Sequence, residues 1–239
     1  MYFATATATL LALTHTICNA QDVTVPATCI DGYQPGTDTA LVTIPYTYDQ
    51  TMSIIGSYKN LTWSGNPDNT VTLNGTDNTV GTARTYDLAG AHVIETILEY
   101  SKPPAPGPYV EVHNTANLSV PAYNVSLYIQ YDGTVVSSVC NGMASMFNFT
   151  ARFCGTNATL VAGLLHELHS NDALTVGKFL GGQNFTDCAA LAMMNGGPMM
   201  NATGTMIAPM PPAATYTGGA AKLGWSVAGV LVGVVGILG

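Results

Sequence analysis

Hydrophobic and polar residues alternate along much of the chain between residues 41 and 153, and this pattern predicts seven strands. In a strand, successive side chains point to opposite faces, so a strand with one covered face is hydrophobic at every second position. Residues 102–108 include four prolines, which cannot donate ladder hydrogen bonds, and therefore form a connection. The expected strands span residues 41–46, 70–76, 80–88, 92–101, 108–113, 122–130 and 143–153.

Two segments have helical periodicity instead. Residues 49–58 predict a short helix that Asp49 could cap. Residues 157–182 predict a long helix, closed by Gly181 and Gly182. The apolar stripe of this helix consists of Val161, Leu164, Leu165, Leu168, Val176 and Phe179.

Asp172 falls on the same stripe and allows two interpretations. Either the helix breaks near Ser170 and Asn171, which are good N-cap residues, or a carboxylate enters the covered space. The favoured interpretation is a break or kink.

Glycosylation triplets indicate which strand faces meet solvent. In residues 143–153, Phe147 and Phe149 share one face, whereas Asn148, which begins an Asn-x-Thr triplet, lies on the other. A glycan on Asn148 requires solvent on its face. The pattern therefore predicts an antiparallel sheet with one covered face, with the long helix as the cover, in an α+β fold.

The two ends predict passage through the secretory pathway. Residues 1–20 resemble a signal peptide, and the apolar run over 223–239 is short, glycine-rich and preceded by small residues. This tail is typical of a GPI-anchor signal, with attachment at Gly218 or, alternatively, at Ala213. A membrane-spanning helix is the other interpretation of the tail.

Charge and composition narrow the class of partner. About 200 residues between the ends suffice for one domain. A net charge of −8 with only six Lys plus Arg leaves no basic surface of the kind that binds nucleic acid, so no nucleic-acid partner is expected. Eight Asn-x-Ser/Thr triplets predict a glycosylated surface protein, at Asn60, Asn74, Asn117, Asn124, Asn148, Asn157, Asn184 and Asn201.

The order of elements resembles the helix-grip fold of the START and birch-pollen-allergen-like superfamily, also called polyketide cyclase-like or SRPBCC, over residues 40–182. The most specific part is "VGTARTYDLAGAHVIETILEY" at 80–100, which is similar to the family's hairpin with Gly and Arg in one strand and Glu in the next. "ARF" at 151–153 supports the match. The resemblance implies a seven-stranded antiparallel sheet wrapped around the long C-terminal helix, with a cavity for lipids, sterols, polyketides or hormones.

The terminal signals, the composition and this resemblance together divide the chain into five parts. After the signal peptide comes an N-terminal extension at 21–39 and then the helix-grip domain at 40–190. A stretch rich in Pro, Met and Gly follows at 191–218 as a stalk, and residues 219–239 are the anchor signal.

The hairpin predicts an ion pair between neighbouring strands. If its loop around Ala89 and Gly90 has two or four residues, Arg84 lies opposite Glu95. A three-residue loop would place Arg84 opposite Thr96. Tyr86, Leu88, Val93, Ile97 and Val80 share the face of the pair, which marks this face as the inner one.

An inward ion pair stabilises a fold poorly, so it could instead orient a polar group of a ligand. A purely structural bridge is an equal alternative. The expected cavity residues are Arg84, Glu95, Tyr86, Val93, Ile97, Phe147, Phe149, Leu165 and Leu168.

"HELH" at 166–169 does not fit a metalloprotease, because that site needs two histidines four residues apart. His166 and His169 are interpreted as solvated or capping residues. No cofactor motif is present, so neither a metal nor a cofactor is expected.

Removal of Cys18 with the signal peptide leaves Cys29, Cys140, Cys154 and Cys188, which allow three pairings. Zinc is the rival interpretation, but the spacings contain no close CxxC pair. The resembled fold places the first strand beside the seventh, and it therefore implies Cys29 with Cys154 and Cys140 with Cys188.

Three functions remain open. The first is a surface-anchored module that binds a small hydrophobic or amphipathic ligand and is held in the outer membrane leaflet by its lipid anchor. The second is a cyclase- or hydrolase-type enzyme with Glu95 or a histidine as base. The third is a structural cell-wall or adhesion glycoprotein. Arg84 would keep Glu95 charged and weakly basic, which favours binding.

Overall fold

The alternating segments form one antiparallel sheet. The computed structural model describes residues 28–67, 70–195, 199–200 and 206–207. The sheet order is β1-β8-β7-β5-β4-β3-β2, and β6 pairs with β7. Its strands are β1 Gln34–Ile44, β2 Thr72–Asn74, β3 Ala83–Leu88, β4 Ala91–Ser101, β5 Tyr109–Thr115, β6 Leu118–Val120, β7 Val125–Val139 and β8 Ala144–Gly155.

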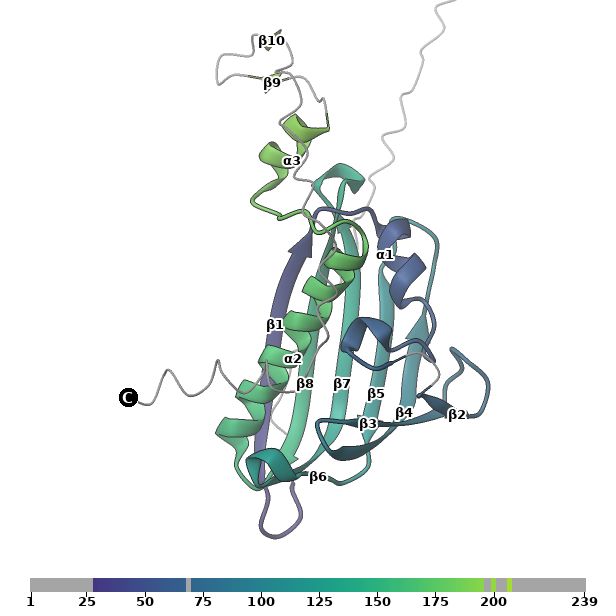
Figure 1. Cartoon of the computed structure of the whole chain (residues 1–239), viewed down its shortest axis with the longest axis vertical. Coiled ribbons are helices and arrows are strands. Elements are labelled where there is room, and N and C mark those ends of the chain that lie inside the picture. Colours follow the sequence, from purple (N-terminus) through teal and green to yellow (C-terminus); the bar gives the residue numbers. More distant parts are fainter. Residues whose placement is uncertain (1–27, 68–69, 196–198, 201–205, 208–239) are drawn as a thin grey trace, which may run out of the picture.

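Helix α2, Ala158–Phe179, covers one face of this sheet and packs mainly along β1 and β8 (Figure 1). Helix α1, Tyr48–Ile55, and the 3-10 turn η1, Thr62–Ser64, lie on the same face beside α2 (Figure 1). The arrangement confirms the predicted α+β helix-grip fold. The predicted strand number was wrong, because the three-residue β6 is too short to produce an alternating pattern.

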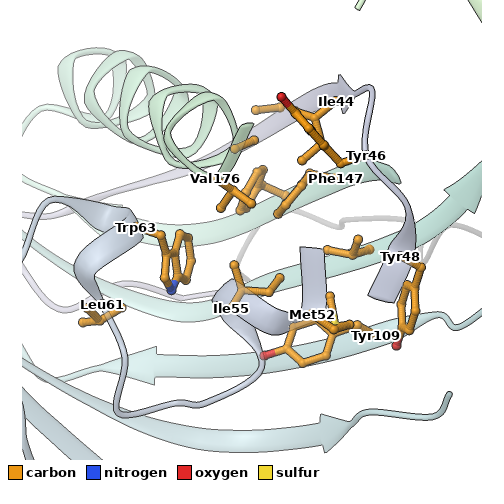
Figure 2. Close-up of a cluster of buried hydrophobic side chains, with 14 of the residues drawn as sticks. Ile44, Tyr46, Tyr48, Met52, Ile55, Leu61, Trp63, Tyr109, Phe147 and Val176 are labelled. Carbon is orange, nitrogen blue, oxygen red and sulfur yellow. The ribbon is translucent and has the colours of Figure 1, made fainter. Parts of the chain in front are cut away.

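One cluster of buried hydrophobic side chains lies under the C-terminal half of α2, and another lies under its N-terminal half around Val161 and Leu165. Figure 2 shows Val176 of α2 beside Phe147 of β8, with Ile55 of α1 and Trp63 of η1 nearby. These side chains are buried, as their positions on inward faces predict. The short turns η2 Pro121–Tyr123 and η3 Cys140–Gly142 connect strands.

Strand β1 begins at Gln34, seven residues before the predicted start at Leu41. The early part of β1 is polar and therefore shows no clear alternation, but it pairs with the end of β8, where Gln34 lies opposite Gly155. Glycine suits position 36, because a Cβ there would collide with the Phe153 ring unless that buried ring moved. The predicted N-terminal extension thus contains part of the sheet.

Two helix predictions need correction. Thr47, not Asp49, caps α1, and Thr47 and Gln50 form a reciprocal capping box. Helix α2 runs unbroken through Ser170 and Asn171, so the favoured break is wrong. The Asn157 side chain accepts a hydrogen bond from Leu160 N at its start.

Two disulfides tie the ends of the domain to the sheet. Cys29 bonds to Cys154 and Cys140 to Cys188, with Cα–Cα distances of 5.7 and 5.1 Å, which confirms the predicted pairing. Cys188 begins the short helix α3, Cys188–Met194, so helical structure extends into the predicted stalk. Beyond it, β9 Met199–Met200 pairs with β10 Met206–Ile207.

Several predictions lie outside the described residues: the signal peptide, the anchor signal, Gly218, Ala213 and Asn201. Within the described ranges, no helix is long and apolar enough to cross a membrane.

Candidate functional site

A cavity of about 630 Å³ lies between α2 and the sheet. Its walls come from η1 and the residues after it, from β3, β4 and β7, from the segment around β6, and from the inner side of α2. Most lining side chains are apolar, and they include Trp63, Val93, Leu127, Ile129, Leu165 and Leu168. This volume is within the usual range of small-molecule sites.

The β3–β4 hairpin builds one wall. Its loop has two residues, Ala89 and Gly90, both with positive φ, as a tight hairpin requires. Arg84 is therefore opposite Glu95, and the predicted pairing is confirmed. The same register places Tyr86 opposite Val93, and both line the cavity.

Arg84 does not line the cavity, although it was expected to do so. It lies behind Glu95, only 4% exposed, with Arg84 Nε 2.5 Å from Glu95 Oε2. Its Nη1 donates to Tyr58 O at 3.0 Å, and its guanidinium lies 4.0 Å from the centre of the Tyr58 ring. Nη2 is 3.8 Å from Glu111 Oε1. These contacts give Arg84 a structural role beside the site.

The Arg84–Glu95 pair is one end of a larger buried ionic network. Glu95 Oε1 accepts from Tyr86 Oη at 2.7 Å and lies 3.4 Å from His113 Nε2. His113 Nε2 is 3.5 Å from Asp132 Oδ2, and Asp132 Oδ1 is 3.3 Å from His169 Nε2. The network consists of Asp38, Arg84, Glu95, Glu111, His113, Asp132 and His169.

The network keeps its members charged at neutral pH. Burial opposes ionisation of Glu95, but Arg84 and His113 outweigh it and lower the Glu95 pKa to about 2. Burial likewise opposes the charge on His169, but Asp132 and Asp38 raise its pKa to about 10. Neither group can therefore act readily as a general base near pH 7.

Asp172 differs from the carboxylates of the network. It is 7% exposed, lines the cavity and accepts a hydrogen bond from Ser64 Oγ at 3.0 Å. None of the ion pairs between described residues includes it. Burial raises the pKa of Asp172 to about 8, and nearby Asp132 adds to the rise, whereas His169, the Ser64 hydrogen bond and Arg84 oppose it.

The remaining predicted cavity residues fall into two groups. Tyr86, Val93, Glu95, Leu165 and Leu168 line the cavity as expected. Ile97, Phe147 and Phe149 do not line it, because they are buried in the core. Val80 was placed on the inner face but is 59% exposed, since β3 begins only at Ala83.

The interpretation of both HELH histidines as solvated is wrong for His169 and right for His166. His169 is buried, with its ring stacked on Phe149 at a centroid distance of 4.9 Å, whereas His166 is exposed and bonds Asp38. Sequence reasoning also missed Glu111. The signal was the alternation of Tyr109, Glu111 and His113, which places all three on the inner face.

The predicted glycosylation sites differ in exposure. Asn60 and Asn148 are half-buried, and the Asn60 amide nitrogen already donates to Ile54 O at 2.8 Å. Their occupancy stays a prediction. The exposed sites among the described residues are Asn74, Asn117, Asn124, Asn157 and Asn184.

Comparison with known proteins assigns no family. No protein-family model matches the chain, and no curated protein matches it significantly. Among solved structures, a protein of Nitrosospira multiformis has 11% identity and a TM-score of 0.46, covering 60% of this chain and 95% of that one. The protein XoxI of Bacillus cereus has 14% identity and a TM-score of 0.45, covering 61% and 95%.

Norcoclaurine synthase of Thalictrum flavum has 9% identity and a TM-score of 0.45, covering 70% of this chain and all of that one. These similarities are too distant to transfer a ligand or an activity. The site must therefore be interpreted from its own chemistry.

Proposed function

We propose that this chain is a binding module that holds a small hydrophobic or amphipathic ligand in the cavity between α2 and the sheet. The observation that carries the proposal is the cavity itself, about 630 Å³ with mostly apolar walls and a few polar groups among them. Apolar surface that a ligand removes from water contributes roughly 25 cal/mol per Å² before the costs of binding.

The geometry gives less support to catalysis. The expected bases were Glu95 or a histidine, yet the network holds Glu95 in its weakly basic form, and both His113 and His169 have raised pKa values. Each of these groups is charged at pH 7 and has partners inside the protein. Binding is therefore the better proposal for this cavity.

A matched pair of leucine variants on α2 tests the proposal. Leu168 lines the cavity, whereas Leu174 is exposed on the same helix and does not line it. Leu168→Glu introduces a charge into the apolar wall and should weaken binding of the neutral dye Nile red at least tenfold. Leu174→Glu should leave it unchanged. Equal dye binding by the parent and both variants, or no binding by the parent, would contradict the proposal.

We further propose that the module is secreted, glycosylated and lipid-anchored at the cell surface. The apolar tail, the small residues around Gly218 and the eight glycosylation triplets support this. A phospholipase specific for lipid anchors should release the protein from cells that express the whole chain. Retention on treated cells, with Gly239 still detected by mass spectrometry, would instead indicate a membrane helix.

A further inference from the structure

Among the described residues, the ionisable side chains that line the cavity include several carboxyl groups and no basic group. Its described lining includes the carboxyl groups of Glu95, Asp132, Glu167 and Asp172, but no Lys, Arg or His. Glu95 and Asp132 already have cationic partners in the buried ionic network. A ligand with a carboxylate or phosphate would bring a like charge into this space, at a cost that low dielectric increases.

Asp172 is the lining carboxyl that is both deeply buried and without a cation. Ser64 Oγ bonds its Oδ2, and no described residue donates to Oδ1. A buried carboxyl must either be neutral or gain a counter-charge, because an isolated charge in a protein interior is costly. Within the described chain no side chain supplies that counter-charge at ion-pair distance.

Asn66 is a second incompletely satisfied polar group at the same end of the cavity, and its amide nitrogen needs an acceptor. It lines the cavity two residues after Ser64 and is 4% exposed, and its Nδ2 has no hydrogen-bond partner among the described residues. A buried amide nitrogen without an acceptor costs roughly 1–3 kcal/mol. The polar groups where η1 meets α2 are thus incompletely satisfied by the protein alone.

From this arrangement we propose that the cavity selects ligands that carry a protonated amine on an apolar body, with the ammonium group bound at Asp172. The apolar body would lie along Trp63, Val93, Leu165 and Leu168, which line the rest of the cavity. The inference rests on the proposed binding function and adds the chemical class of the ligand. It also excludes fatty acids as preferred ligands.

Three probes with one chain length test the class of ligand: dodecylamine, dodecanol and dodecanoic acid, each used below the concentration at which it aggregates or separates from solution. Calorimetric titration of the parent protein at pH 8.5 should rank the amine at least tenfold tighter than the alcohol, and the acid weakest. If the alcohol binds as tightly as the amine, the inference is wrong and the binding function stands. If none of the three binds, both proposals are wrong.

Asp172→Asn and Glu167→Gln locate the amine site. Glu167 is a half-buried lining carboxyl on the same helix, so its replacement controls for the overall negative charge of the cavity. Asp172→Asn should remove the preference for amine over alcohol, whereas Glu167→Gln should keep most of this preference. An unchanged preference in Asp172→Asn would overturn the assignment to Asp172.

The pH dependence of amine affinity provides a further readout. Asp172 must ionise to bind a cation, so affinity should rise between pH 6 and pH 9 while an alkylamine, with a pKa of ~10.4 like lysine, stays protonated. The groups that act on Asp172 are Ser64 of η1, Asp132 of β7, Arg84 and Tyr86 of β3, and His169 of α2 itself. Asp172→Asn should abolish this rise, and a rise that persists in the variant would contradict the inference.

Discussion

Asp172 shows how a single residue can be misjudged from sequence. Its place on the apolar stripe of α2 left two interpretations, a helix break or a buried carboxyl, and the buried carboxyl is correct. A break would leave backbone N–H and C=O groups of the helix without hydrogen bonds, and such unpaired groups destabilise the fold where they are shielded from water. A carboxyl can instead avoid the cost of a buried charge by holding its proton, and this raises its pKa to about 8.

Asp172→Asn should therefore stabilise the free protein at alkaline pH. The folded-state pKa of about 8 lies above the unfolded value of ~3.9. The contribution of Asp172 to stability is therefore full below pH ~4 and declines until pH ~8. The Asp172→Asn variant lacks this pH-dependent loss of stability, because an amide side chain does not titrate. Urea unfolding at pH 8 should give Asp172→Asn a free energy of unfolding about 2 kcal/mol or more above that of the parent. At pH 4 this difference should be absent.

Asp31→Asn is the control for this experiment, because Asp31 is exposed. It should change the free energy of unfolding by less than ~0.5 kcal/mol at either pH. A stability difference between Asp172→Asn and the parent that does not depend on pH would show that Asp172 is not protonated in the fold.

Replacement of Arg84 tests how much the buried ionic network contributes to stability. Arg84→Met removes the guanidinium that Glu95 and Glu111 share and leaves His113 between two buried carboxylates, which should lower the free energy of unfolding by roughly 3 to 5 kcal/mol. Arg152→Met is the matched control, since Arg152 is half-buried and stacks on Tyr131 at 4.8 Å. This control should cost less than ~1 kcal/mol. Equal losses for both variants, measured by urea unfolding, would contradict a special role for Arg84.

At the scale of elements, α2 is the piece that organises the site. It carries Asp172 and the apolar wall of the cavity, and it supplies His169 to the buried ionic network. Its start is defined by Asn157, which is both the N-cap and the first residue of an Asn-x-Thr triplet. The cap and the glycan can be separated by mutation, because they depend on different atoms and different residues.

Asn157→Ala should destabilise the protein by about 1 kcal/mol, because Leu160 N loses its cap acceptor. The variant also removes the glycosylation triplet. Thr159→Ala removes the triplet but keeps the cap, and Thr159 is exposed, so this control should be neutral. Thermal unfolding of both variants from a glycosylating host separates the effects. Equal destabilisation would assign the loss to the glycan.

At the scale of the whole molecule, the disulfides fasten the chain ends to the sheet. Cys29–Cys154 holds the segment before β1 against the end of β8, and Cys140–Cys188 holds α3 against the turn between β7 and β8. The sequence separations are 125 and 48 residues. In the chain-entropy model, the longer loop gives the larger stabilisation.

Replacing either cysteine pair with alanine should lower the free energy of unfolding by roughly 2 to 5 kcal/mol. The Cys29/Cys154 variant should lose about 1 kcal/mol more than the Cys140/Cys188 variant, because its loop is longer. Urea unfolding of the two variants checks the order. Peptide mapping without reduction checks the pairing, and a peptide that joins Cys140 to Cys154 would contradict it.

The sequence by itself was enough to predict the features that depend on local periodicity. Alternation placed β3 and β4, and a loop of two or four residues around Ala89 and Gly90 predicted Arg84 opposite Glu95. The structure then decided against the three-residue loop. The disulfide pairing followed once the resemblance supplied the order of strands. Periodicity shows on which face of a helix or strand a side chain lies. The strand pairing and the ion pair could be predicted largely from that information.

Only the tertiary structure decided which inward groups meet one another and which meet the cavity. Asp38, Asp132 and His169 lie far apart in the sequence and come together because β1, β7 and α2 pack around one point. Arg84 and Asp172 both point inward, yet one is enclosed by its partners and the other borders the cavity. That difference depends on depth and on neighbours across the sheet, and the period of a strand or a helix contains neither.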